Sequence, residues 1–200
     1  MVETEEGRLL ETGGFLASDG GNWLGLGALA TYDTRDHVVN PGMGVHVELS
    51  ALAFPEALGT TGYRKVVLDA RRFLPLRSGS TVAFRTYLEG SGGDVPVLLL
   101  PSLGGRGRLR GYYEGRLRDR VAGAAQGELR FPLWRRFGGV AFAEVGQVGP
   151  GLGDLVLGRI ERSAGAGLRF RLGQESARIR ADFAVGRRGS GLYLTIGEAF

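Results

Sequence analysis

The sequence predicts an all-β protein, a transmembrane antiparallel up-and-down β-barrel of about ten strands. Apolar and polar residues alternate with a period of two along most of the chain, and 36 of its 200 residues are glycine. The alternating runs approach the roughly 9–11 residues that a tilted strand needs to cross a bilayer, whereas strands of soluble proteins average about 5–6 residues. Glycine costs about 1 kcal/mol relative to alanine inside a helix, so its abundance disfavours a helical fold.

The alternating runs follow one another from residue 23 to the C-terminus. In one of them Leu168 and Phe170 alternate with Arg169 and Arg171. A soluble sandwich also alternates, but arginine on the polar face favours a barrel whose lumen is polar. A weaker run at residues 8–18 would supply a tenth strand. The stronger runs cover residues 23–33, 45–53, 65–71, 82–89, 126–133, 164–172, 178–186 and 192–200, and the segment 140–145 between them alternates ambiguously.

The connections between the runs predict the orientation. Bacterial barrels place long loops outside the cell and short turns in the periplasm, and on this rule both termini are periplasmic. Ten strands satisfy the even count of such barrels; eight strands, or a part of a larger barrel, are the alternatives. We expect one domain over residues 1–200. The long connections are residues 54–62, 91–123 and 149–162, and the short ones are residues 76–79, 133–136 and 173–176.

Composition excludes several classes of site. The chain has no cysteine, so it has neither disulfides nor thiolate metal ligands. His37 and His46 share no metal-ligand spacing with a third residue, and no nucleophile or phosphate-loop motif is present. The net charge of +4 comes almost wholly from arginine, interleaved with carboxylates, which disfavours nucleic-acid binding. We therefore expect no catalytic residue, no metal, no cofactor and no enzymatic activity.

No stretch approaches the roughly 20 apolar residues of a membrane helix. The acidic start of the chain lacks the apolar segment of a signal peptide, so we expect any export signal to have been removed. Aromatic residues near strand ends are expected to form the girdles at the membrane interfaces. These residues are Trp23, Tyr63, Tyr87, Trp134, Phe137 and Tyr193.

Several motifs, in this order along the chain, resemble those of the BamA-, TamA- and FhaC-type outer-membrane assembly and secretion proteins. They are Tyr32-Asp33-Thr34-Arg35-Asp36, Asn40-Pro41-Gly42, Leu109-Arg110-Gly111-Tyr112, Glu128-Leu129-Arg130-Phe131, Phe142-Ala143-Glu144 and the segment 192–200 with its C-terminal Phe200. The resemblance covers the chain from about residue 23 to its end. Members usually have sixteen strands and periplasmic POTRA domains, and this chain has room for neither, so it resembles a short form without POTRA domains.

The resemblance implies a role for Arg110, Gly111 and Tyr112 at the tip of a long extracellular loop that folds into the lumen. In the family the arginine pairs with acidic residues of the inner wall, and Glu128 and Glu144 stand at the matching positions. Alternation independently places Glu128 inward, whereas it leaves the orientation of Glu144 ambiguous. The family more commonly has aspartate where Glu144 stands. The group either fixes a plug and stabilises the barrel, which we favour, or acts as a gate.

Two further groups of residues carry expectations. Asp33, Arg35 and Asp36 in the periplasmic turn are expected to cap the turn and form salt bridges, in preference to catalysis or metal binding, because aspartate bonds readily to nearby backbone. Leu194, Ile196 and Phe200 resemble an outer-membrane sorting and assembly signal and close the apolar series that faces lipid.

The resemblance implies an integral protein of the bacterial outer membrane that is a minimal insertase or translocator. A structural barrel or narrow passive pore plugged by the Arg110 loop is the alternative, as is the membrane anchor or exporter domain of a larger protein. The expected partners are outer-membrane lipids and lipopolysaccharide, unfolded outer-membrane protein clients, and a second copy in a homo-oligomer, but not nucleic acid.

Overall fold

The computed structural model describes residues 20–155, 160–172 and 178–200. It has an all-β architecture built from strands of 8 to 14 residues, with two short strands and single 3-10 turns in the connections. The nine long strands are β1 (Leu26–Asp33), β2 (Gly44–Phe54), β3 (Tyr63–Pro75), β4 (Thr81–Gly93), β7 (Val121–Trp134), β8 (Phe137–Gly149), β9 (Glu161–Arg171), β10 (Arg178–Gly186) and β11 (Gly189–Ile196).

The short elements lie in the connections. The 3-10 turns are η1 (Glu56–Leu58), η2 (Arg77–Gly79), η3 (Val97–Leu99) and η4 (Leu152–Asp154), and the short strands are β5 (Ser102–Leu103) and β6 (Leu117–Arg118). Within the described ranges, no helix is both long and apolar enough to cross a membrane.

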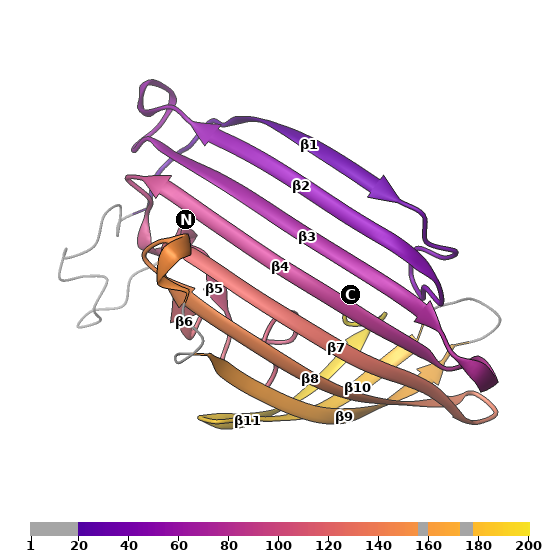
Figure 1. Ribbon diagram of the computed structural model, residues 1–200. Helices are drawn as coiled ribbons and strands as arrows, with labels where there is room; N and C mark the ends of the chain where they lie inside the picture. The colour runs from indigo at the N-terminus through magenta and orange to yellow at the C-terminus, as the bar shows by residue number, and fades with distance from the viewer. Residues whose placement is uncertain (1–19, 156–159, 173–177) are drawn as a thin grey trace.

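The nine long strands form one antiparallel sheet in chain order, β1-β2-β3-β4-β7-β8-β9-β10-β11. The sheet curves into an open trough, with β1 and β11 as its two edges, and the β5–β6 hairpin lies on its concave side (Figure 1). The predicted antiparallel up-and-down order is therefore confirmed. The predicted strand at residues 8–18 lies outside the described residues, and within those no pairing joins β1 to β11.

The two ends of the sheet differ. We call the end with the β1–β2, β3–β4 and β7–β8 connections the turn end, and the end with the β2–β3, β4–β7 and β8–β9 connections the loop end. Two connections outside the predicted set depart from the rule of long outer loops and short periplasmic turns. β10 and β11 are joined at the loop end by a hairpin of only two residues, Arg187 and Arg188, whereas ten residues, 34–43, join β1 to β2 at the turn end.

The alternation along the strands places opposite residue types on the two faces. On β7 the side chains of Gln126, Glu128 and Arg130 are buried on the concave face, while Leu129 and Leu133 are exposed on the convex face. β10 repeats the pattern, with buried Arg180 and Asp182 opposite exposed Phe183. The polar face thus turns inward and the apolar face outward, as the period-two pattern predicts for a membrane barrel.

The orientation of the aromatic residues follows this alternation, and not in every case the prediction that they form girdles at the membrane interfaces. Trp134 and Phe137 are exposed on the convex face, beside the β7–β8 turn. The assignment of Tyr63 and Tyr87 to the girdle is wrong, because both fall on the inward face of their strands and are buried there. Tyr63 stacks on Phe54 at 4.3 Å between ring centroids. Strand parity, not closeness to a strand end, decides their orientation.

Trp23 lies at the loop end, half-buried, where its Nε1 donates to Thr61 Oγ1 at 3.0 Å. Tyr193 of β11 also departs from the girdle prediction. It belongs to the inward face of that strand, and its hydroxyl accepts a hydrogen bond from the loop inside the trough.

One glycine of the inner wall leaves room for a ring on the neighbouring strand. Gly165 of β9 pairs with Phe142 of β8, and a Cβ at residue 165 would overlap both the Phe142 ring and the carbonyl oxygen of Phe183. Glycine, which has no Cβ, lets the ring lie flat against the wall at this point.

Gly165→Ala is therefore expected to destabilise the folded barrel by about 1–3 kcal/mol through overpacking. The measurement is the temperature at which the detergent-solubilised chain loses its folded mobility in gel electrophoresis. Gly153→Ala is the matched control, since a Cβ at that residue meets nothing within 4 Å and its φ is not positive. Equal melting of both variants and the parent would contradict the proposed close contact.

Candidate functional site

The site is built by the connection between β4 and β7, residues 94–120, which folds back into the trough. The β5–β6 pairing and a tight turn closed by the Gly104–Arg108 bridge hold its shape. Leu109, at the start of the tip, has a φ of +64°, a conformation that is costly for a non-glycine residue and persists only when its surroundings hold it. Here the conformation is held because the next residue, Arg110, is bound to side chains of the inner wall.

Arg110 lies at the tip and is fully buried. Its guanidinium donates to three carboxylates on three strands: Nη2 to Glu128 Oε1 at 2.7 Å, Nε to Glu144 Oε1 at 2.6 Å, and Nη1 to Asp182 Oδ2 at 2.6 Å. Its backbone N–H also donates to Glu144 Oε2. The predicted approach of Arg110 to Glu128 and Glu144 is present in the structure, and both carboxylates face inward.

Two contacts complete the surroundings of the guanidinium. Its central carbon lies 3.4 Å from the centroid of the Phe142 ring, a geometry in which the negative face of the ring attracts the cation. Gln126 Nε2 donates to Glu144 Oε1 at 2.9 Å, so that oxygen accepts from both Gln126 and Arg110. Burial on its own lowers the pKa of Arg110, but the attraction of Glu128, Glu144 and Asp182 outweighs burial and raises that pKa above its ordinary value. The cation is permanent.

Gly111 and Tyr112 fix the loop on either side of this contact. Gly111 has a φ of +92°, and a Cβ there would lie 2.8 Å from the backbone nitrogen of Gly186 on β10, so glycine is required by both conformation and space. Its N–H donates to the Tyr193 hydroxyl at 2.8 Å. The Tyr112 hydroxyl donates to Glu161 Oε2 at 2.9 Å and accepts from the N–H of Arg187 at 3.1 Å.

The charges continue away from Arg110 with alternating sign. Glu128 Oε2 accepts from Arg130 Nε at 3.0 Å, and Arg130 Nη2 donates to the backbone oxygen of Phe200 at 3.1 Å. On the other side, Asp182 pairs with Arg169, whose Nε donates to Glu198 Oε2 at 2.8 Å. Alternation of sign lets each buried charge contact its opposite, which offsets the cost of removing it from water.

Sequence reasoning missed Asp182, Phe142 and Tyr193 as members of this site. The alternation in residues 178–186 did place Asp182 on the polar face, but nothing local to β10 indicates that this face meets a loop 72 residues earlier in the chain. The contact arises from the curvature of the sheet, which brings β10 toward the loop that hangs from β4 and β7.

The turn motif acts as predicted within the β1–β2 connection. Arg35 Nε and Nη2 donate to the Asp33 carboxylate at 2.9 and 2.6 Å, and His46 lies 3.2 Å from the same carboxylate. Asp36 Oδ1 accepts from the backbone N–H groups of Gly42 and Met43 at 2.9 and 3.1 Å. These contacts close the turn and engage all three charged residues. In the described part of the chain, no cluster of three or more potential ligands could hold a metal ion.

The C-terminal residues do not share one face. Leu194 and Ile196 are 70% and 76% exposed on the convex face of β11, as predicted. Phe200 departs from the prediction that it continues the lipid-facing series. Gly197, with a φ of +95°, ends the strand, and Phe200 is buried in the trough against Phe73. Because the strand ends at Gly197, the alternation of inward and outward side chains does not continue to Phe200, and the outward orientation expected from it is lost.

Comparisons with known proteins agree with this architecture. The Omp85 superfamily domain matches residues 19–200. Among solved structures, the chain is similar to BamA from Haemophilus ducreyi lacking POTRA domains 1–3, with a TM-score of 0.70 and 17% identity. That alignment covers 86% of this chain and 41% of the BamA chain, so this chain spans about two fifths of its relative. No curated protein matches the sequence.

Arg110→Ala is expected to destabilise the barrel by about 3–5 kcal/mol, because it leaves three buried carboxylates without their common cation. Limited proteolysis should then cut the loop between β4 and β7, which the parent protects, and thermal unfolding should occur at lower temperature. Arg116→Ala in the same loop is the matched control, since its side chain is exposed. Unchanged melting and proteolysis of Arg110→Ala would refute the assignment of a plug.

Proposed function

The chain belongs to the Omp85 superfamily, and from this premise we propose that it assists the assembly or translocation of outer-membrane proteins by pairing client strands with the edges of its sheet. The family is one of outer-membrane assembly and translocation barrels. The observation that carries the proposal is that β1 and β11 each have one unpaired edge within the described residues. On this proposal the chain acts on polypeptides without chemical catalysis.

An unpaired edge in a membrane calls for a partner. Each backbone N–H or C=O left without a hydrogen bond in hydrocarbon costs several kcal/mol, and β1 and β11 each span 8 residues. An extended client segment would satisfy these groups by strand addition, for which backbone hydrogen bonds supply the affinity. The apolar outer face of β11, with Leu192, Leu194 and Ile196, suits a client that is itself to be lipid-exposed.

The plug and one edge are physically connected. The Tyr193 hydroxyl on β11 accepts from the N–H of Gly111, which follows Arg110 in the loop. A change in the position of the loop tip would therefore act directly on the edge strand. This contact supports a gate more than a passive plug, although the two roles differ only in whether the loop moves during function.

A plugged structural barrel or narrow pore is the second candidate function. It is favoured by the burial of Arg110 and by the packing of Leu109 and Tyr112 against Tyr87, Ala122 and Ala124, which holds the loop against the inner wall. Since barrels of about eight strands are already filled by side chains, a larger one with an inserted loop would conduct poorly. The anchor or exporter domain of a larger protein is a further candidate, because the chain spans only part of its relative.

The membrane location and the partners that we propose are those expected for the same family. We place the turn end and the C-terminus beside it in the periplasm, with outer-membrane lipids and lipopolysaccharide around the convex face. The predicted periplasmic N-terminus falls in residues 1–19, outside the described residues. Unfolded outer-membrane proteins are the proposed clients. A second copy of the chain in a homo-oligomer would also satisfy the edges that are unpaired within the described residues, so client and copy would compete for them.

Liposomes that contain the folded chain should accelerate the folding of a second outer-membrane barrel relative to empty liposomes. The expected effect is several-fold in initial rate, because a free edge supplies the first strand pairing, whose ordering cost otherwise limits nucleation. Folding is read from the heat-modifiable mobility of the substrate barrel. A chain with Leu29→Pro and Thr31→Pro on β1 tests this edge, since the N–H groups of these two residues point away from β2, toward the unpaired side, and proline removes them as donors.

The matched control substitutes Ala141→Pro and Ala143→Pro on the central strand β8, which should prevent the chain from folding and so give the rate of empty liposomes. If the folded parent gives no acceleration, the assembly function is wrong and the passive barrel stands. An acceleration that the β1 variant retains in full would exclude this edge as the pairing site.

Single-channel recording separates the two candidates by conductance. With the loop held by Arg110, the parent should show small or flickering currents. Arg110→Ala should raise the open current or its duration, because the loop loses its attachment to three strands. A steady, porin-sized current from the parent would contradict the presence of a plug.

A further inference from the structure

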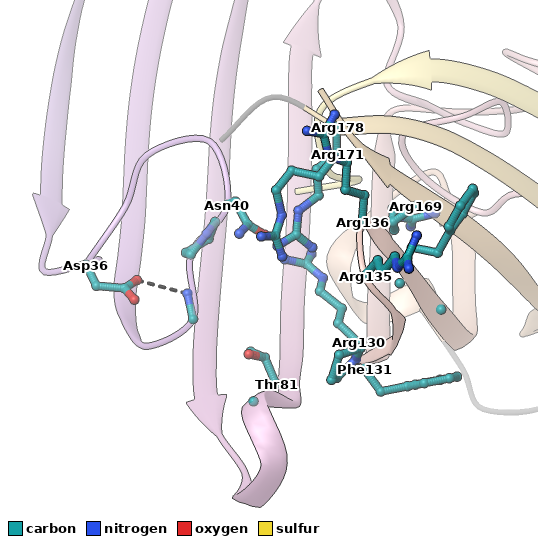
Figure 2. A pocket seen from close by; sticks show the side chains of 17 residues that line it. Asp36, Asn40, Thr81, Arg130, Phe131, Arg135, Arg136, Arg169, Arg171 and Arg178 are labelled. Atoms are coloured by element: carbon teal, nitrogen blue, oxygen red, sulfur yellow. Dashed lines mark hydrogen bonds between the residues drawn. The ribbon is translucent and has the colours of Figure 1, made fainter. Parts of the chain in front are cut away.

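A second cluster of arginines lies at the turn end of the trough, away from the Arg110 loop. A cavity of about 260 Å³ opens there between the β1–β2 connection and the ends of β7, β8, β9 and β10. Figure 2 shows Arg136, Arg171 and Arg178 reaching the same space as Asn40, with Asp36 on the far side of the connection. The arginines of its lining are Arg130, Arg135, Arg136, Arg169, Arg171 and Arg178.

The charges of this lining do not balance. Asp36 is its one carboxylate among the described residues, and its Oδ1 accepts from two backbone N–H groups. Glu198, nearby, is shared by three arginines of the lining, Arg169, Arg178 and Arg130, at 2.8, 3.3 and 3.9 Å. Arg130 and Arg169 have further partners in Glu128 and Asp182, so the imbalance lies with the other arginines. Within the described chain, the side chains of Arg136 and Arg171 have no carboxylate within ion-pair distance. Like charges brought together without counterions repel one another, so the lining favours an anion.

Two buried atoms strengthen this inference. Arg130 and Arg169 are 5% and 2% exposed, and both line the cavity. Arg130 Nη1 and Arg169 Nη2 are buried and lack a hydrogen-bond partner within the described chain. A buried charged donor that makes no hydrogen bond is costly, and both residues that carry such a donor belong to the lining of the cavity. Thr81 and Asn40 add a hydroxyl and an amide to the same lining.

We propose that this cavity binds a phosphate group, either as a free phosphate or in the headgroup of an anionic lipid. Phosphate suits the lining because its several oxygens can accept from guanidinium groups that approach from different strands, and arginine matches phosphate geometry in a bidentate manner. The cavity is separate from the unpaired edges of β1 and β11, so the proposal of a phosphate site does not depend on the proposed assembly function.

The position of the cavity brings it near a source of lipid phosphate. Exposed Trp134 stands on the convex face at the end of β7, and Arg135 beside it lies 4.7 Å from the centroid of its ring. Tryptophan at a strand end marks the level of the lipid headgroups. Arg135 and Arg136, which line the cavity and follow Trp134 in the chain, therefore lie at about the depth of the phosphates of the surrounding leaflet.

The test compares thermal unfolding of the full chain in a zwitterionic detergent with inorganic phosphate and with chloride at equal ionic strength. Phosphate should raise the melting temperature of the parent in a saturable way. Arg136→Gln with Arg171→Gln should weaken the apparent affinity by about tenfold or more, as expected when charge-assisted hydrogen bonds are lost. Both side chains are exposed, so the variant should fold.

The matched control is Arg64→Gln with Arg162→Gln, which removes the same charge from exposed arginines at the loop end. It should respond to phosphate like the parent. No phosphate-specific rise in the parent would overturn the proposal, as would an equal loss of the response in both variants. An acidic peptide without phosphate that binds through Arg136 and Arg171 where phosphate does not would also overturn it.

The source of the phosphate is decided by a second arm. The chain is reconstituted in phosphatidylcholine vesicles with and without phosphatidylglycerol, and its melting is measured against added inorganic phosphate. If the anionic lipid alone raises the melting temperature and removes the effect of added phosphate, the ligand is the headgroup. If inorganic phosphate acts equally in both vesicles, the ligand is the free anion.

Discussion

The guanidinium of Arg110 is the interaction on which the interior depends. It is shared by carboxylates of β7, β8 and β10, so that one cation from a loop joins three wall strands. None of these charges would be tolerable alone in a space sealed from water, because the effective penalty is several kcal/mol per ion. The wall therefore requires the loop as much as the loop requires the wall, and the inserted loop is an integral part of the fold.

The same logic extends along the trough. From Arg110 the signs alternate through Glu128 to Arg130, and through Asp182 and Arg169 to Glu198, which brings the C-terminal residues into the lumen. Toward the turn end the trough is lined by more arginines than carboxylates. Balanced charge in the middle serves structure, and unbalanced charge at the mouth is what a binding site for an anion needs.

The strands, their two faces and the inward Glu128 followed from the sequence, because a period of two is a local property. The Arg110 contacts with Glu128 and Glu144 came from resemblance, since local pattern left the parity of Glu144 open. Neither the alternation nor the family resemblance predicted the roles of Asp182 and Tyr193, because these roles depend on the curvature that brings β10 and β11 to the loop. Phe200 was misplaced because one glycine, Gly197, resets the parity of everything after it.

The distribution of the core suggests which edge is free to move. The three clusters of buried apolar residues draw on β3, β4, β5, β7, β8 and β10, on the loop and on Phe200, but β1 and β2 contribute no residue to them. β1 is exposed along its whole length, whereas β11 is held through Tyr193 to Gly111. Opening at β1 would break strand hydrogen bonds without exposing packed side chains, and elements with few buried contacts open most readily. On the proposed assembly function, the β1 side is therefore where we expect a client strand to be admitted while the charged interior stays intact.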